Sequence, residues 1–275
     1  YAVKVASASG CATGVAQTYA SVSGTSQAFT TLAAGTWYVC VTATDAAGNT
    51  TNATNNSYTF VIDTTAPAPF SITGPATPTN NTTPTVAWGA ATDANTVTYA
   101  VKVASASGCA TGVAQTYTSL SGTSRALTAL ADGTWYACVT ATDAAGNSRT
   151  ASNNSYAFVV DTVAPTSTSI SINGGAASTT STTATLTLAA TGAGNMYITN
   201  TAGCASGGNY ETYATSKSWT LGQSIGTATV YVKFKDAAGN ESTCINDTIT
   251  VETPYPAPAT ASTSVGTFDG YNTNY

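Results

Sequence analysis

Short stretches in which apolar and polar residues alternate recur along the whole chain. In the central third they occupy residues 83–88, 98–105, 134–143 and 155–161, and they are rich in β-branched and aromatic side chains. Alternation with a period of two places one face of a strand against a core and the other face in water. Turn-forming segments separate them, such as "DAAGN" at 143–147. The pattern predicts an all-β, antiparallel fold.

The whole pattern repeats along the chain. The nineteen residues that start at Tyr1 return unchanged from Tyr99, so the period is 99 − 1 = 98 residues. Differences at expected core positions are mild, such as Phe29 against Leu127, which two copies of one fold tolerate. A third, diverged copy follows, in which "KDAAGN" at 235–240 echoes the earlier "TDAAGN". A repeat of this length has the size of a whole domain, and the sequence therefore predicts domains in tandem.

The repeat and the turn-forming segments within it predict the domain boundaries. We expect a partial domain at 1–65, a complete one at 66–163, a diverged one at 164–253 and an extended tail rich in Pro and Thr at 254–275. The linker "DTTAP" at 63–67 is short and contains Pro, which limits swivel between neighbouring domains. The expected arrangement is a beads-on-a-string rod.

The complete middle copy resembles a known group of sandwich domains. "TPTVAW", which ends at Trp88, resembles the second strand of a fibronectin type III domain, and "LADGTWYACVTATD" at 130–143 resembles its sixth strand. "DAAGN" and "DTTAP" resemble the bacterial Ig-like repeats of large secreted surface proteins. The resemblance implies tandem Ig/fibronectin-III-like β-sandwiches. It also implies that Tyr136, two residues before Cys138, and its counterpart Tyr38 form tyrosine corners, with the ring in the core and the hydroxyl on the incoming loop.

The first copy starts where the middle copy has already passed its second strand. It is therefore expected to lack strands A and B, including the counterpart of Trp88, which exposes its core and a strand edge. Two sources for the missing strands stay open: upstream residues of a longer chain, or a strand donated by another subunit. The tail at 254–275 contains "STSVGTF", a possible donor strand. Donation from chain to chain would give a head-to-tail fibre.

The six cysteines are spaced to match the repeat. In the first two copies the spacings 40 − 11 and 138 − 109 are both 29 residues, which favours one disulfide in each copy. The last two cysteines then pair by elimination, although the second of them follows "DAAGN" instead of preceding it, so this bridge must take another route. Disulfides indicate an oxidising, extracellular setting. The predicted bonds are Cys11–Cys40, Cys109–Cys138 and Cys204–Cys244.

Composition excludes several classes of partner. Charged residues make up only 7% of the chain, against about 25% in an ordinary soluble domain. The net charge of −5 argues against nucleic acid, whose phosphates select basic proteins. No apolar run approaches the roughly 18 residues that a membrane span needs. We expect a secreted protein at the cell surface, without a cofactor.

Catalytic chemistry has no recognisable place in this sequence. The chain contains no His, which excludes Ser-His-Asp and Cys-His arrangements and leaves no ligand set for zinc. Asp63 and Asp161 end the last strand before each domain junction, where carboxylates can bind calcium and stiffen the joint. Each junction offers only one such fixed acid, however, so an ordinary strand-end Asp is the simpler interpretation. The chain is not expected to be an enzyme.

Two functions from different classes remain. Near-identical copies, few charges and one disulfide per domain favour a structural stalk or fibre subunit of a bacterial surface protein or adhesin, which associates with itself or with neighbouring Ig-like domains. The alternative is an adhesive or carbohydrate-binding module that binds a surface glycan or protein through the diverged third copy. Its "GGNYETYATSKSW" loop at 207–219 offers Tyr210, Tyr213 and Trp219 as a shallow aromatic surface.

Overall fold

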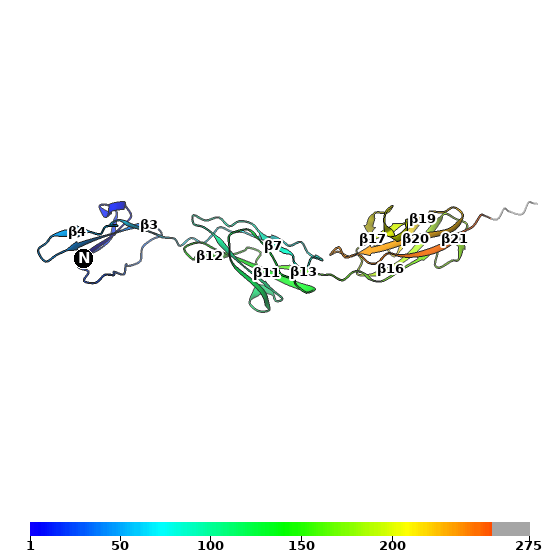
Figure 1. Ribbon diagram of the computed structural model, residues 1–275, viewed down its shortest axis with the longest axis horizontal. Helices are drawn as coiled ribbons and strands as arrows, with labels where there is room; N and C mark the ends of the chain where they lie inside the picture. Colours follow the sequence, from blue (N-terminus) through cyan, green and yellow to red (C-terminus); the bar gives the residue numbers. More distant parts are fainter. Residues whose placement is uncertain (255–275) are drawn as a thin grey trace, which may run out of the picture. The chain divides into compact units, whose positions relative to one another are not determined.

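The computed structural model describes residues 1–254, so the expected donor strand in the tail lies outside the described residues. The chain divides into two compact units, Tyr1–Thr162 and Val163–Tyr275. The described part of each unit is built from β-strands, with three short 3₁₀ turns between them (Figure 1). Within residues 1–254, no helix is long and apolar enough to cross a membrane.

The first repeat forms one five-stranded sheet. Its central strand β3 pairs with β1, β4 and β5, and β2 pairs with the other edge of β1. The described residues include no second sheet over this one, as the missing strands A and B predict. The strands are β1 (Ala2–Ala6), β2 (Val15–Tyr19), β3 (Gly35–Thr44), β4 (Thr50–Asn52) and β5 (Tyr58–Ile62).

The middle repeat contains the same sheet and a second, three-stranded sheet that covers it. The larger sheet has the order β12-β11-β8-β9, with β13 also paired to β11, and the smaller has the order β10-β7-β6. The larger sheet consists of β8 (Thr98–Ala104), β9 (Val113–Leu120), β11 (Gly133–Thr142), β12 (Ser148–Thr150) and β13 (Tyr156–Val160), and the smaller of β6 (Ile72–Gly74), β7 (Thr85–Trp88) and β10 (Ser124–Ala126).

The core of the middle repeat lies between these two sheets. Because side chains alternate along a strand, β11 turns Ala137, Val139 and Ala141 inward, and all three are fully buried. Val86 and Trp88 of β7 meet them from the smaller sheet. The alternation predicted from the sequence therefore produces an antiparallel β-sandwich here.

A strand found in the middle repeat is absent from the first. Residues Ser124–Ala126 form β10 by pairing with β7. The corresponding residues 26–28 have almost the same sequence, Ser-Gln-Ala against Ser-Arg-Ala, but form no strand. Their pairing partner β7 has no counterpart in the first repeat, so this repeat lacks all three strands of the covering sheet.

The third repeat is a second complete sandwich. One sheet has the order β14-β16-β19, and the other has the order β15-β21-β20-β17-β18, in which only β15 pairs in parallel. Its core contains Leu186, Val232 and Phe234, all fully buried. The strands are β14 (Thr166–Ile172), β15 (Ser178–Thr179), β16 (Thr183–Thr191), β17 (Asn195–Thr199), β18 (Tyr210–Thr212), β19 (Ser216–Thr220), β20 (Gly226–Lys235) and β21 (Ile245–Val251).

The three disulfides join the cysteines in the expected pairs, Cys11–Cys40, Cys109–Cys138 and Cys204–Cys244. In every repeat the first cysteine ends a 3₁₀ turn, and in the first two repeats the bridge fixes that turn to β3 or β11. The third bridge instead ends at the residue before β21, which explains the different spacing. The turns are η1 (Ser9–Cys11), η2 (Ser107–Cys109) and η3 (Ala202–Cys204).

The prediction of tyrosine corners at Tyr38 and Tyr136 is wrong, because both side chains lie on the face of the sheet that points away from the core. Tyr136 packs against Cys109 and Cys138 in a small cluster separate from the sandwich core, and Tyr38 packs in the same way on its own disulfide. Residues two apart share a face, and Cys138 points outward to the turn that bears Cys109. In the core, a different tyrosine ties a loop: the backbone N–H of Ala91 donates to the Tyr99 hydroxyl, 2.8 Å away.

Candidate functional site

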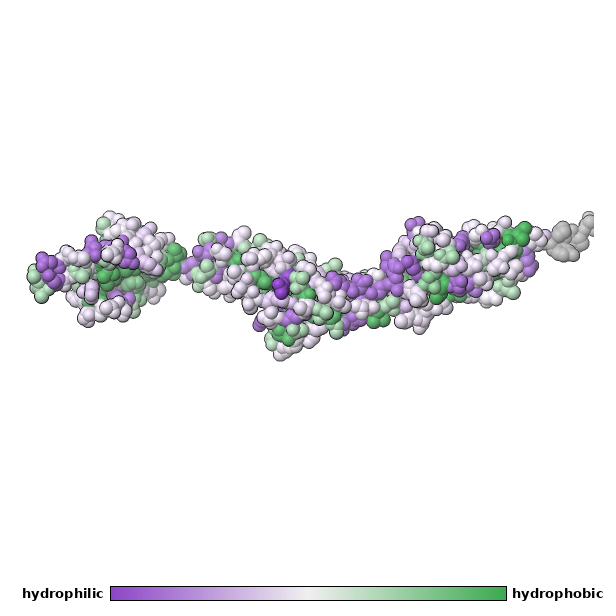
Figure 2. All heavy atoms as spheres, in the orientation of Figure 1, coloured by the Kyte–Doolittle hydropathy of each residue, from purple (hydrophilic) through white to green (hydrophobic). Residues whose placement is uncertain are grey.

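The first sheet exposes an apolar face that the middle repeat buries. Val139 and Phe158 are 0% exposed under the smaller sheet, whereas their counterparts Val41 and Phe60 remain partly exposed. Figure 2 shows apolar side chains gathered on the visible face of the first repeat. We call the inward side of strands β1, β3 and β5 the open face.

Two shallow hollows lie on the open face. One of about 290 Å³ is bounded by Tyr1, Val3 and Val22, and one of about 400 Å³ is bounded by Asn55 and Phe60. In the middle repeat, Tyr99 replaces Tyr1, and Phe70 and Trp88 pack against its ring, at centroid distances of 5.8 and 5.4 Å. The hollows therefore mark where the side chains of a covering sheet would lie.

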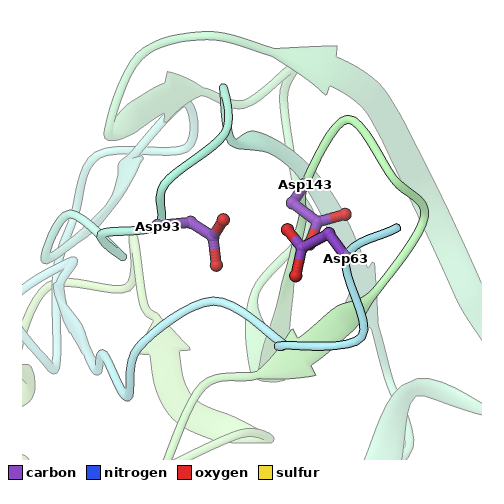
Figure 3. Close-up of side chains that lie close together, drawn as sticks. All are labelled: Asp63, Asp93 and Asp143. Atoms are coloured by element: carbon purple, nitrogen blue, oxygen red, sulfur yellow. The ribbon is translucent and has the colours of Figure 1, made fainter. Parts of the chain in front are cut away.

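A cluster of three carboxylates forms where the first repeat meets the middle one. Carboxylate oxygens of Asp63, Asp93 and Asp143 lie within 4.8 Å of one another, and Figure 3 shows the Asp63 and Asp93 side chains turned toward each other, with Asp143 next to Asp63. Asp63 follows β5, Asp93 lies in the loop before β8, and Asp143 follows β11. Three chain segments far apart in the sequence thus contribute one acid each.

Hydrogen bonds fix each member of this cluster. The Asn95 side-chain amide donates to the Asp63 carboxylate, and the Asn147 amide donates to the Asp63 carbonyl at 3.0 Å. Burial raises the pKa of Asp143, but hydrogen bonds from the side chain and backbone of Asn147 and from the backbone of Ala145 outweigh it, so the pKa lies below the usual value. The bonds tie the linker after β5 to two loops of the middle repeat.

The cluster corrects the expectation of one acid at each junction. Three carboxylates provide oxygen ligands of the kind that calcium takes, and Asp93 and Asp143 are the members that sequence reasoning missed. Asp161, the other calcium candidate, belongs to no such cluster among residues 1–254. The third repeat has Gly192 in "AATG" where the middle repeat has Asp93 in "AATD", a difference that the sequence already displays.

The three aromatic residues proposed as a ligand surface do not form one. Tyr213 is partly buried and packs against the core of the third repeat with its ring edge-on to Phe234, and its hydroxyl accepts a hydrogen bond from the Ala190 backbone at 3.1 Å. Trp219 lies on the smaller sheet, and Tyr210 lies on the larger one. The three rings therefore do not share one surface, because two lie on different sheets and Tyr213 packs against the core.

Tyr210 instead packs beside two lysines and a glutamate on the larger sheet. The Lys235 ammonium lies 3.6 Å from the centroid of its ring, and Lys233 pairs with Glu241 at 2.7 Å beside it. Burial, followed by the neighbouring Glu241 carboxylate, raises the pKa of Tyr210 to about 12. These side chains bind one another, which leaves little of the Tyr210 ring for a ligand.

The raised pKa makes the third repeat sensitive to alkali. An unfolded tyrosine titrates near pH 10, so between about pH 10 and 12 the unfolded chain binds fewer protons than the folded one, and stability falls as the pH rises. We expect the Tyr210→Phe variant to lose less stability between pH 8 and pH 11 than the unchanged chain, measured by denaturant unfolding. The matched variant Tyr231→Phe should behave like the unchanged chain. An equal loss in all three proteins would contradict the assignment.

Comparison with known proteins identifies the middle repeat. Its residues 71–162, which include both of its sheets, match the family model described as a bacterial Ig-like domain. The middle repeat is a bacterial Ig-like domain. The first repeat reproduces the larger sheet of this Ig-like domain strand for strand, and the third is a diverged sandwich with the same disulfide-bearing turn. The family match itself covers the middle repeat, and the other two repeats are built from antiparallel strands that carry the same kind of turn.

Similar solved structures include two multidomain β-proteins. The fibronectin(III)-like modules of Clostridium thermocellum CbhA have a TM-score of 0.44 and 12% identity, with 67% of this chain and 94% of that chain covered. The FN1–FN3 domains of chicken CNTN1 have a TM-score of 0.37 and 12% identity, with 91% of each chain covered. Among curated proteins, none matches the sequence of this chain.

Proposed function

We propose that this chain is a structural subunit of an extracellular bacterial stalk or fibre, in which the open face is completed by strands from a neighbouring repeat. The observation that carries the proposal is the contrast between two copies of one sheet. The open face leaves Val41 and Phe60 partly exposed, while Val139 and Phe158 are fully buried. An apolar sheet face of this kind is a surface that further strands can cover.

Other features support a structural role over a catalytic one. Each repeat has its own disulfide, and the closed loops of 29, 29 and 40 residues limit how far each repeat can unravel. The linker after β5 is fixed by Asn147 and by Arg149, which donates to the Pro67 carbonyl. Disulfides also fit an oxidising compartment, and we place the protein at the cell surface.

The alternative of a glycan-binding module is weakened because one of its three aromatic residues, Tyr213, packs against the core. A carbohydrate platform needs aromatic rings exposed side by side, whereas Tyr213 is packed on Phe234 and the Trp219 indole N–H donates to Asn200 at 2.9 Å. No specific contact favours this function, and a glycan array serves as its test.

Electron microscopy of the native material tests the stalk proposal. We expect linear arrays in which domains of this size follow one another with a regular repeat, and no retention of the purified chain on a glycan array. Isolated molecules in the native material, together with selective glycan binding, would overturn the proposal in favour of the adhesive alternative.

A further inference from the structure

We propose that Asn173 in the third repeat is a modification site: when the end of β14 opens, the Asn173–Gly174 pair converts to aspartate and isoaspartate. This pair is the single Asn-Gly step in the sequence of 275 residues. Glycine after asparagine favours the reaction, because glycine has no side chain to hinder its own attacking nitrogen. The inference concerns the third repeat by itself and does not depend on the proposed stalk function.

The turn after β14 requires both of these residues. Asn173 and Gly174 have φ angles of 50° and 67°, in the left-handed region that asparagine and glycine adopt most readily. The Gly175 backbone N–H donates to the Ile172 carbonyl at 3.0 Å and closes the turn around them. Positive φ at both central residues is typical of a type I′ turn, for which Asn-Gly is a preferred sequence. The backbone conformation therefore selects a chemically reactive pair.

The Asn173 side chain takes the place of a main-chain acceptor in the sheet. The Asn173 N–H donates to the Thr185 carbonyl at 2.8 Å, which extends the pairing of β14 with β16. The return bond runs from the Thr185 N–H to the side-chain Oδ1 of Asn173, also at 2.8 Å. In a regular antiparallel pair this N–H would bond to a main-chain carbonyl. The bond holds the carboxamide of Asn173 against β16.

A carboxylate from the other sheet holds the residue before the turn. The Ile172 N–H donates to Oδ2 of Asp247 in β21 at 2.8 Å, and the Ile172 side chain is 1% exposed in the core. Because β14 is an edge strand of its sheet, these contacts and the bond between Thr185 and Asn173 keep its end closed.

The reaction needs no partner except water. The Gly174 backbone nitrogen, after losing its proton to solvent, attacks Cγ of Asn173. A bond forms between this nitrogen and Cγ, the bond between Cγ and Nδ2 breaks, and ammonia leaves. Water then opens the resulting succinimide ring at either of its carbonyls. One opening gives aspartate, and the other gives isoaspartate, in which the main chain runs through the former side-chain carbon.

The folded turn opposes this attack. Ring closure brings Cγ onto the Gly174 nitrogen, so Oδ1 of Asn173 leaves the Thr185 N–H and the residue leaves the conformation that the turn imposes. Opening the end of β14 removes both restraints. Because the ends of strands open locally at a lower free energy than the whole domain, the reaction rate is set by the fraction of molecules in which this end is open.

The reaction leaves a lasting change in the third repeat. Isoaspartate adds a carbon to the main chain, so the Gly175 N–H and the Ile172 carbonyl lose the spacing that closes the turn. Aspartate keeps the main chain and retains an oxygen acceptor for the Thr185 N–H. The middle repeat has Thr73–Gly74 at the corresponding place, where this chemistry has no side-chain amide to start from. A third repeat that has opened and reacted therefore differs covalently from one that has stayed closed.

Peptide mass mapping of the full chain in mildly alkaline buffer, with and without urea, tests the inference. We expect Asn173 to convert at least about tenfold faster in urea, because only the open fraction reacts in buffer. The Asn147–Ser148 pair is an internal control. It should convert more slowly than Asn173 in urea, since the serine side chain hinders the attacking nitrogen.

Variants of Asp247 test the restraint without denaturant. Asp247→Ala removes the acceptor of the Ile172 N–H and should raise the rate of conversion of Asn173 in buffer about tenfold, the effect of losing a hydrogen bond to a charged group. The matched variant Asp247→Asn keeps an oxygen acceptor and should convert at nearly the rate of the unchanged chain. Hydrogen exchange at the buried Phe234 amide shows whether each variant is folded.

Hydrogen exchange in the unchanged chain gives a test that needs no variant. The Thr185 amide donates to Asn173, so its protection measures the open fraction directly. The ratio of the conversion rates in buffer and in urea should equal that fraction. A larger ratio would mean that the closed turn reacts, and equal rates in buffer and urea would mean that the fold has no influence; either result overturns the inference.

The site itself is overturned if Asn173 stays unmodified in urea while Asn147 converts. None of these results depends on whether native material forms linear arrays. The modification site and the stalk proposal therefore stand or fall separately.

Discussion

Replacing Phe158 by alanine is expected to lower the free energy of unfolding of the middle repeat by about 3–5 kcal/mol, the usual cost of removing a buried phenylalanine. The same change at Phe60 should cost about 1 kcal/mol or less, in the range of a partly exposed side chain. Phe158 is fully buried between two sheets, and Phe60 lies on the open face. The two residues occupy equivalent positions, so the difference measures the contribution of the covering sheet.

Because the chain holds several domains, one global unfolding curve does not separate them. Native-state hydrogen exchange at the amides of Val139 in β11 and Val41 in β3 reports on each repeat by itself. Each substitution should lower the hydrogen-exchange protection only of the reporter amide in the same repeat, since the two sheets have separate cores. Equal losses at both reporters would mean that the first sheet is as well packed as the middle one, and the open face would then need another explanation.

Removal of one disulfide is the change with the next largest expected effect. Replacing both Cys109 and Cys138 by serine should lower the stability of the middle repeat by about 3–4 kcal/mol, because the bridge closes a loop of 29 residues in the unfolded chain. The Cys204/Cys244 pair closes 40 residues and should contribute nearly the same amount, since the entropy of closure grows only with the logarithm of loop length.

Chemical unfolding followed by the same hydrogen-exchange reporters measures these losses. The matched change at Cys11 and Cys40 should have the most severe outcome, because the first sheet has no covering sheet to hold it when the bridge is gone. A loss of less than about 1 kcal/mol in the middle repeat would indicate that residual structure in the unfolded chain already holds the loop closed.

The strands and disulfides of this protein could be predicted because they depend on local pattern and on the repeat. Alternation in residues 134–143 corresponds to β11, and equal spacing pairs Cys11 with Cys40 and Cys109 with Cys138. Elimination then gives the third pair. Each of these inferences needs only the sequence period and the chemistry of one segment.

The remaining features depend on neighbours that the pattern does not reveal. Alternation shows that Tyr136 and Cys138 share a face, but not which face is the core. The carboxylate cluster needs Asp63, Asp93 and Asp143 to meet through three loops, and spacing along the chain gives no sign of this. Residues 26–28 and 124–126 show the limit most clearly, since nearly identical segments differ in structure because only one of them has a strand to pair with.

The distribution of strands within the period has a genetic consequence. In the complete repeat, the covering strands β6 and β7 come first in the chain and the larger sheet follows. A recombination event that aligned Tyr1 of one gene with Tyr99 of another would insert or delete 98 residues, which always contain one covering pair and one larger sheet. Gene lineages could thus lengthen or shorten the protein by whole repeats, each of which brings its own covering pair.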